Sequence, residues 1–359
     1  MKILLITTGG TISQEDADGK HLSVGEVANQ GFLDYVRANP KNADVSIDVK
    51  NLFNIDSTNI TPEHWNAILK VLEAEHYNYD AFCMTHGTNT MGMTAAALSF
   101  GLKSFGKPVY MTGSQVPFGV EGADANQNFE NMIRIARDYH KVMKGVFVVM
   151  GSVVMVGTRI KKISDNDYHA FSSFQQNALA SFGSKAILQF DEARLASNNA
   201  SYEPRGKIEV FSSYPTHVIS SFTDHAGIDP NDFKLLVEQG GKKGFIIRGV
   251  GVGDIHESLV PILDFLREKK VPVAVTTQIP TGVSSMDVNE PGIIAEQHGA
   301  IPAYDMNIES MTAKMAYLIG EGVPYEGFKA EMLRNYKGEI NVDKYLNSDR
   351  GSWKDFQKK

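Results

Sequence analysis

Two threonine hydroxyls and one lysine stand where the sequence predicts that short buried strands end. Thr11 follows the first strand, Thr88 follows a second within the segment H-G-T-N-T-M, and Lys162 comes after a third. A hydroxyl is a weak nucleophile near neutral pH and needs an adjacent base. A lysine can serve as that base if burial lowers its pKa from about 10.4 toward neutrality. Threonine and lysine on converging loops therefore indicate an acyl-transfer site, although a lysine that follows a strand is more often simply solvated.

The first strand decides where Thr11 lies. Ile3 to Ile6 form an unbroken apolar run, which is typical of a strand buried on both faces of a parallel sheet. Gly9 and Gly10 then allow a tight turn and a close approach of the backbone to a ligand. Ligands of open α/β sheets bind at this edge. A dinucleotide-binding fingerprint is excluded because the glycines are adjacent and no third glycine follows at the required spacing. A plain turn at the end of the strand is the other interpretation.

Several common types of site are missing from the sequence. It contains no H-E-x-x-H, no G-x-S-x-G and no P-loop motif, and Cys83 is its only cysteine. A single cysteine excludes an intramolecular disulfide and a cysteine metal site. We therefore expect no cofactor and no metal.

Composition narrows the class of protein. The chain has 359 residues, of which 42% are hydrophobic and 21% charged, and a formal net charge of −7. These values are ordinary for a globular protein, and the net charge gives no indication of a nucleic-acid or membrane surface. No apolar run approaches the roughly 18 residues that span a bilayer, and the first residues do not resemble a signal peptide. We expect a cytoplasmic protein whose partner is a small molecule, with no nucleic-acid or membrane partner.

Strands and helices alternate along most of the chain, which predicts an α/β fold. We expect an N-terminal catalytic α/β domain with a mostly parallel sheet over residues 1–190. Residues 191–212, which include Pro204 and a stretch without periodicity, are expected to connect it to a smaller α/β domain over 213–359. Helices are predicted over 24–37 and 125–139, and a strand over 145–156. Thr61 and Pro62 predict the start of another helix, because they suit the N-cap and the first helical position.

A series of motifs, in order along nearly the whole chain, resembles the bacterial-type L-asparaginases. They are T-G-G-T-I at 8–12, D-S-T-N-I-T-P at 56–62, H-G-T-N-T-M at 86–91, T-G-S-Q at 112–115, G-T-R-I-K-K at 157–162 with H-A-F-S at 169–172, T-T-Q at 276–278, and D-M-N-I-E-S at 305–310. The absence of a signal peptide suggests the cytoplasmic, type I branch. The resemblance implies a two-domain asparaginase-like fold and the hydrolysis of L-asparagine to L-aspartate and ammonia.

The resemblance also implies roles for individual residues. Thr11 is the nucleophile that forms an acyl-threonine ester, and Thr88 and Lys162 form a second catalytic group that activates a hydroxyl or water. Ser57 and Thr58 match the pair that holds the α-carboxylate of the substrate. Ser114 falls in a loop that lines the pocket. The protein is expected to form a homodimer or homotetramer, with the active site between one N-terminal domain and the C-terminal domain of a partner.

The chain departs from the family pattern at three places. Asn89 stands where the family has an aspartate that binds the α-ammonium of the substrate, and losing that charge weakens binding by roughly ten- to a hundredfold. Either the natural substrate lacks an α-ammonium, or Asn89 is a substitution that traps ligand. The family usually has a lid whose tyrosine is hydrogen-bonded to the nucleophile. Between Ser13 and Gly31 this chain has no tyrosine, and Lys20 or His21 falls nearest that position. His21 is either a substitute base or an ordinary solvent-facing histidine. Ile279 replaces the cysteine of the family's regulatory site.

Alternatives to an L-asparaginase remain open at this point. Asn89 favours an amidase that acts on a different small carboxylate amide. Asn89 and the missing lid tyrosine also suit a slow or non-catalytic protein that binds asparagine or aspartate, whereas Thr11 and Lys162 oppose that interpretation. A component of a transfer-RNA-linked amidotransferase shares the fold but carries an additional N-terminal domain, whereas this chain starts at the first strand.

Overall fold

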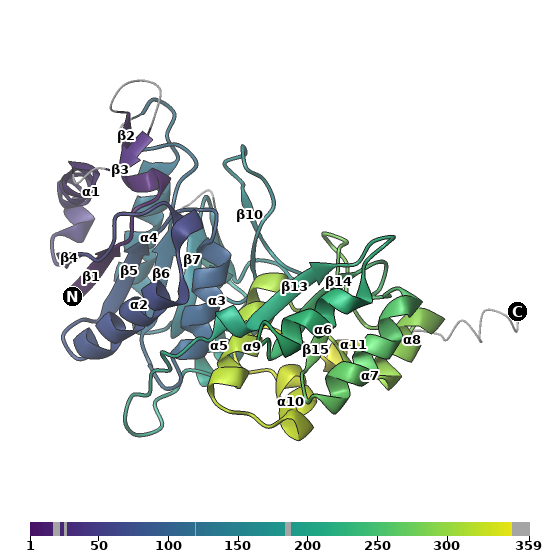
Figure 1. The fold of residues 1–359 in the computed structure, drawn as a ribbon. Coiled ribbons are helices and arrows are strands. Elements are labelled where there is room, and N and C mark those ends of the chain that lie inside the picture. The colour runs from purple at the N-terminus through teal and green to yellow at the C-terminus, as the bar shows by residue number, and fades with distance from the viewer. Residues whose placement is uncertain (17–21, 25–26, 119, 184–187, 347–359) are drawn as a thin grey trace, which may run out of the picture. The chain divides into compact units, whose positions relative to one another are not determined.

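The computed structural model describes residues 1–16, 22–24, 27–118, 120–183 and 188–346. The chain divides into two compact units, Met1–Ser213 and Tyr214–Lys359. Each contains a sheet with helices packed against it, in agreement with the predicted α/β class (Figure 1).

The first unit is built around an eight-stranded sheet in the order β12-β11-β8-β7-β6-β5-β1-β4. The strands β7, β6, β5, β1 and β4, neighbours in this order, run parallel to one another. The strands β8, β11 and β12 extend the sheet from β7 by antiparallel pairing. The strands, in chain order, are β1 (Lys2–Thr7), β4 (Ser46–Asn51), β5 (Ala81–Thr85), β6 (Pro108–Thr112), β7 (Gly145–Met150), β8 (Val153–Val156), β11 (Ala180–Phe182) and β12 (Leu188–Phe190). Every residue of β5, β6 and β7 is buried, because helices cover both faces of the central sheet.

The helices of this unit lie on opposite faces of the sheet. One core cluster joins α1 and α4 to alternate residues of the strands, including Ile3, Cys83 and Tyr110. On the other side Trp65 of α2 donates a hydrogen bond to Thr94 of α3. The helices are α1 (Val27–Ala38), α2 (Pro62–Glu75), α3 (Met91–Gly101), α4 (Ala125–Tyr139) and α5 (Glu192–Ala200), with 3₁₀ turns η1 (Thr11–Ser13), η2 (Pro40–Asn42) and η3 (Ser57–Asn59).

Two small antiparallel sheets complete the first unit. β2 (Gln14–Asp16) pairs with β3 (Leu22–Val24), and β9 (Ile160–Lys162) pairs with β10 (Phe171–Ser173). The β9–β10 hairpin is separate from the main sheet, and its exposed tip runs from Ile163 to His169 (Figure 1).

The second unit contains a four-stranded parallel sheet in the order β13-β14-β15-β16. Its core joins Phe233 of α6, Leu263 of α7 and Ala295 of α8 to one face of this sheet. The elements are β13 (Ile219–Thr223), β14 (Gly244–Gly249), β15 (Val273–Thr277), β16 (Ala300–Pro302), α6 (Pro230–Glu238), α7 (Val260–Glu268), α8 (Glu290–Gln297), α9 (Ile308–Gly320), α10 (Tyr325–Leu333), α11 (Asp343–Leu346), η4 (Thr216–Val218) and η5 (Glu257–Leu259).

The structure differs from two of the sequence-based expectations. The strand expected over 145–156 is a hairpin of β7 and β8, which turns at Gly151 with a φ of 57°. Only Gly151 and Ser152 interrupt the apolar residues here, and both strands are buried and need the same residue types, so the sequence hides the turn. Residues 192–200, inside the stretch expected to connect the domains, form helix α5, whose Leu195 belongs to the core of the first unit. Asp191 caps this helix by accepting a hydrogen bond from the Arg194 backbone.

Among the described residues, no helix combines the length and the apolar character needed to cross a membrane.

Candidate active site

Three turns of the first unit meet at the carboxyl ends of β1, β4 and β5. Gly9 and Gly10 have φ angles of 94° and 86°, which L residues with a side chain rarely adopt. A Cβ on Gly10 would lie 2.3 Å from the Cα of Gly87, and a Cβ on Gly87 would lie 2.6 Å from Ser57 Oγ. The turns after β1 and β5 therefore approach each other backbone to backbone, and the turn after β5 also meets the Ser57 side chain, at distances that leave no room for a Cβ.

Thr11 follows Gly10 directly and opens the 3₁₀ turn η1. It is half-buried. A nearby residue ties this segment to β5, because the backbone N–H and the hydroxyl of Thr8 both donate to Thr85 O, at 3.2 and 3.0 Å. The fold thus fixes the predicted nucleophile beside the turn that carries Thr88.

Lys162 reaches the same turn from the β9–β10 hairpin. Its ammonium donates hydrogen bonds to Thr88 Oγ1 at 3.0 Å and to Asn89 Oδ1 at 2.9 Å. Burial lowers the pKa of Lys162, and the negative charge of Asp165 partly offsets that effect. Lys162 is therefore engaged with the predicted hydroxyl group and easier to deprotonate than a solvated lysine.

A second set of contacts leads from Asn89 to a carboxylate. Asn89 Nδ2 donates to Thr58 Oγ1 at 3.2 Å, and the Thr58 backbone N–H donates to Asp56 Oδ1 at 2.8 Å. Hydrogen bonds from the backbone and side chain of Thr58 lower the pKa of Asp56. Asp56 was not among the predicted site residues. Its place before Ser57, where it caps the 3₁₀ turn η3, is the sequence signal that identifies it.

Ser57 and Ser114 are both almost fully buried. The Ser57 carbonyl accepts a hydrogen bond from Thr90 Oγ1 at 2.6 Å, which holds η3 against the turn after β5. Ser114 Oγ has no hydrogen-bond partner among the described residues. The carboxylate of Asp124 accepts from the backbone N–H groups of Gln115 and Val116 and so fixes the turn that presents Ser114.

His86 is a buried member of this cluster that the sequence did not single out. Its Nδ1 lies 2.7 Å from Gly87 O, and burial lowers its pKa from 6.5 to about 4. Because a carbonyl only accepts hydrogen bonds, Nδ1 carries the proton and the ring is neutral. Its Nε2 has no partner within the described part of the chain. His86 therefore braces the turn of Thr88 as a neutral donor.

Two of the predicted site residues, Lys20 and His21, lie outside the described residues. Ile279, which stands in place of the family's regulatory cysteine, belongs to the second unit and is exposed. No group of three or more His, Cys, Asp or Glu side chains within the described ranges is arranged to hold a metal ion.

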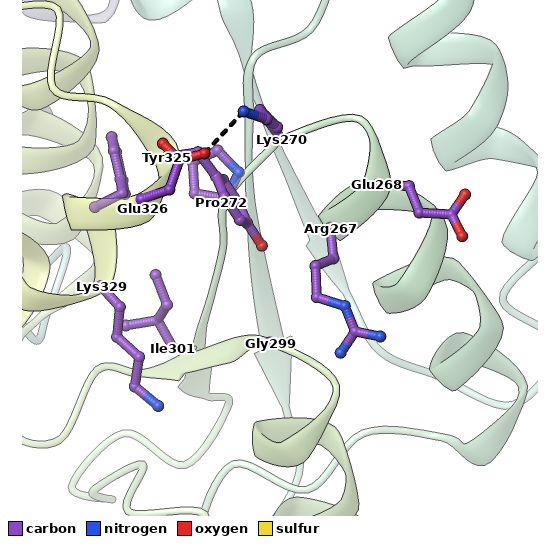
Figure 2. A pocket seen from close by; sticks show the side chains of 10 residues that line it. Arg267, Glu268, Lys270, Pro272, Gly299, Ile301, Tyr325, Glu326 and Lys329 are labelled. Carbon is purple, nitrogen blue, oxygen red and sulfur yellow. Dashed lines mark hydrogen bonds and ion pairs between the residues drawn. The ribbon is translucent and has the colours of Figure 1, made fainter.

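The second unit has a hollow of its own, with a volume of about 400 Å³, between α7, β16 and α10 (Figure 2). Tyr325 lies at its wall, and two of its lysines form ion pairs. Lys270 contacts Glu326 at 2.8 Å, and Lys329 contacts Glu296 at 3.0 Å. The charges of these two lysines are therefore partly offset by their partners.

Comparison with known proteins places the chain among relatives over nearly its whole length. The family model described as "Asparaginase, N-terminal" matches residues 2–194, and "Glutaminase/Asparaginase C-terminal domain" matches residues 219–332. The chain is 28% identical to the L-asparaginase of Thermococcus kodakarensis, over 95% of this chain and 99% of the relative. It is 29% identical to a component of the glutamyl-tRNA(Gln) amidotransferase of Methanothermobacter thermautotrophicus, over 94% of this chain and 77% of the relative.

A solved structure agrees with these matches. L-asparaginase I from Vibrio cholerae superimposes with a TM-score of 0.83 at 28% identity and covers 95% of this chain and 99% of that structure.

Proposed function

The chain belongs to the asparaginase family, and we propose that it hydrolyses the side-chain amide of L-asparagine, or of a closely related small carboxylic acid, to the acid and ammonia. Amidohydrolase chemistry is what the family supports.

The proposed reaction has two steps. Thr11 Oγ attacks the amide carbon, and the hydroxyl proton passes to the departing nitrogen. Ammonia then departs, and an acyl-threonine ester remains. Water then attacks the ester carbon, the carboxylate is released, and Thr11 regains its proton. Each step needs a base beside a hydroxyl or a water molecule.

The contact between Lys162 Nζ and Thr88 Oγ1 is the observation that carries this proposal. When Lys162 loses its proton, the direction of the hydrogen bond reverses, because Thr88 then donates to the neutral amine. The Thr88 oxygen becomes more basic as a result and can take a proton from Thr11 or from water. A lysine with a lowered pKa suits this role, since it spends part of its time neutral.

Ammonia release from L-asparagine by the wild type, Thr11→Ala and Thr88→Ala tests the proposal. We expect both substitutions to abolish turnover, and Thr11→Ala to retain ligand binding in calorimetry because it removes only the hydroxyl and one methyl group and leaves the predicted binding residues in place. Thr216→Ala, which removes a hydroxyl from the second unit, is the matched control and should keep full activity. Undiminished turnover by Thr11→Ala would refute the role of Thr11. Binding without ammonia release by the wild type would support the binding-protein alternative.

The acyl-threonine ester has a direct test. Rapid acid quenching during turnover should give a protein whose mass is increased by the acyl group, located on the peptide that contains Thr11. Thr11→Ala should show no such increase.

Self-association belongs to the same proposal. We propose a homodimer or homotetramer in which the C-terminal unit of a partner completes the active site. Sedimentation at several concentrations should give two or four times the chain's mass, 39.5 kDa. Activity that persists in a species of single-chain mass would refute the shared site.

A further inference from the structure

A chain of hydrogen bonds runs through the candidate site from a cation to an anion. It starts at Lys162 Nζ, which donates to Asn89 Oδ1 at 2.9 Å, and continues from Asn89 Nδ2 to Thr58 Oγ1 at 3.2 Å. It ends at Asp56 Oδ1, which accepts from the Thr58 backbone at 2.8 Å. All four residues belong to the first unit.

The charges at the two ends determine which way the Asn89 amide points. An ammonium only donates hydrogen bonds and an ionised carboxylate only accepts them. The amide oxygen of Asn89 must therefore face Lys162, which leaves the NH₂ group to face Thr58. Reversing the amide would place N–H groups against the Lys162 ammonium and its oxygen against a hydroxyl that Asp56 already engages.

The hydrogens that this hydrogen-bond chain leaves unused are available to a ligand. Asn89 uses one of its two Nδ2 hydrogens, and Lys162 uses two of its three. Asn89 is exposed, so a ligand can reach its remaining N–H. A ligand group here meets the second Nδ2 hydrogen of Asn89, whereas the carboxylate of Asp56 lies at the far end of the hydrogen-bond chain. An oxygen acceptor can bind such a donor, and an ammonium finds no carboxylate partner beside it.

An aspartate at position 89 would lose one contact of this hydrogen-bond chain. A carboxylate has no hydrogen to donate to Thr58 Oγ1, so it would compete with Asp56 for the Thr58 hydroxyl. It would also add a second negative charge near Asp56. Asn89 therefore makes a contact in this hydrogen-bond chain that an aspartate could not make.

We propose that the natural substrate presents an oxygen acceptor, and not an ammonium, to Asn89. This inference rests on the proposed amide hydrolysis and names its substrate class: the monoamide of a small dicarboxylic acid with a hydroxyl or keto oxygen in place of the α-ammonium. Hydrolysis of 2-hydroxysuccinamate with one water gives the hydroxy diacid and ammonia, by the same two steps at Thr11.

The decisive experiment compares kcat/KM for L-asparagine, succinamate and 2-hydroxysuccinamate. We expect the wild type to prefer 2-hydroxysuccinamate to L-asparagine by ten- to a hundredfold, because one charge-assisted hydrogen bond has about that effect. Succinamate, which has only hydrogen at this carbon, should fall between them. Asn89→Asp should invert the order by favouring the ammonium.

Asn59→Asp is the matched control. Asn59 is an exposed residue of the same loop, and its substitution adds the same charge without entering the hydrogen-bond chain. Its ratio of kcat/KM values should stay within twofold of the wild-type ratio. An equal inversion by Asn59→Asp would overturn the proposal, since the net charge of the loop would then decide specificity.

Product binding gives a readout that needs neither turnover nor the Asn89 variant. Malate should bind wild type at least tenfold more tightly than L-aspartate in calorimetry. If L-asparagine and L-aspartate are preferred, the inference is overturned and the proposed amide hydrolysis stands. If no amide is hydrolysed while malate is preferred, amide hydrolysis is refuted and the preference for an oxygen acceptor stands.

Discussion

Replacing His86 tests whether a buried neutral histidine braces the turn of Thr88. Burial lowers the pKa of His86 from 6.5 to about 4. Between these pH values His86 is therefore protonated in the unfolded chain and neutral in the native structure. The stabilisation is fully present above pH 6.5 and is lost as the pH falls toward about 4. The difference is about 2.5 pH units, and at about 1.4 kcal/mol per unit the cost reaches about 3 kcal/mol.

Urea unfolding of wild type and His86→Gln at a series of pH values measures this cost. Glutamine keeps an N–H donor for Gly87 O but does not titrate, so the free energy of unfolding of the wild type should fall by about 3 kcal/mol more than that of the variant between about pH 7 and pH 4. His225→Gln is the matched control, because the His225 ring also contacts the carbonyl of the next residue, at 3.0 Å, but is exposed. Parallel curves for the wild type and His86→Gln would refute the reasoning.

Three further predictions concern Gly10, the buried Lys314–Glu339 ion pair of the second unit, and Lys162. Gly10→Ala should destabilise the first unit and lower kcat/KM at least a hundredfold, because its Cβ would meet Gly87. Gly227→Ala is the control, because Gly227 has a φ of 89° and open space around it, and it should cost only about 1–2 kcal/mol in urea unfolding. Equal costs for the two substitutions would contradict this prediction. Lys314→Met should cost about 3–5 kcal/mol in the same assay, because it leaves Glu339 buried without its 2.7 Å partner, and a loss below about 1 kcal/mol would count against it. The kcat/KM of the wild type should rise with pH as Lys162 loses its proton, below the ordinary lysine pKa, and Lys162→Met should lack this rise.

Local signals in the sequence were sufficient for much of the fold. Thr61 and Pro62 start α2 with a capping box that includes His64, and α4 spans the predicted residues 125–139. These features depend on contacts within one turn of helix, which adjacent residues specify. The α/β class and its mostly parallel sheet followed in the same way from the order of apolar runs.

Turns inside buried apolar stretches could not be predicted in this way. The hairpin of β7 and β8 is buried on both strands, so no polar residue marks it except Ser152 beside Gly151. Helix α5 begins at a good N-cap, Asp191, but its asparagine-rich sequence buries only Leu195 and Asn198, too few for a visible periodicity.

The candidate site was predictable as a set of residue types but not as a set of contacts. Lys162 and Thr88 are 74 positions apart, and only the fold shows that they touch. Asp56 and the orientation of the Asn89 amide are further examples, since the two ends of the hydrogen-bond chain decide whether the amide oxygen or the NH₂ group faces Lys162. The roles of these residues in catalysis stay predictions until the variants are assayed.

The β9–β10 hairpin has an exposed tip that should open on warming before the main sheet unfolds. Its tip is tied to the first unit by Tyr168, which donates to Gly122 O at 2.8 Å, and by Gln115, which donates to Asp165 O at 3.0 Å. Exposed segments held by few hydrogen bonds open at a smaller free-energy cost than a buried sheet. On warming, the tip should therefore open while the eight strands remain intact. The proposed role of Lys162, which lies in β9 next to this tip, predicts that activity then falls reversibly below the melting temperature.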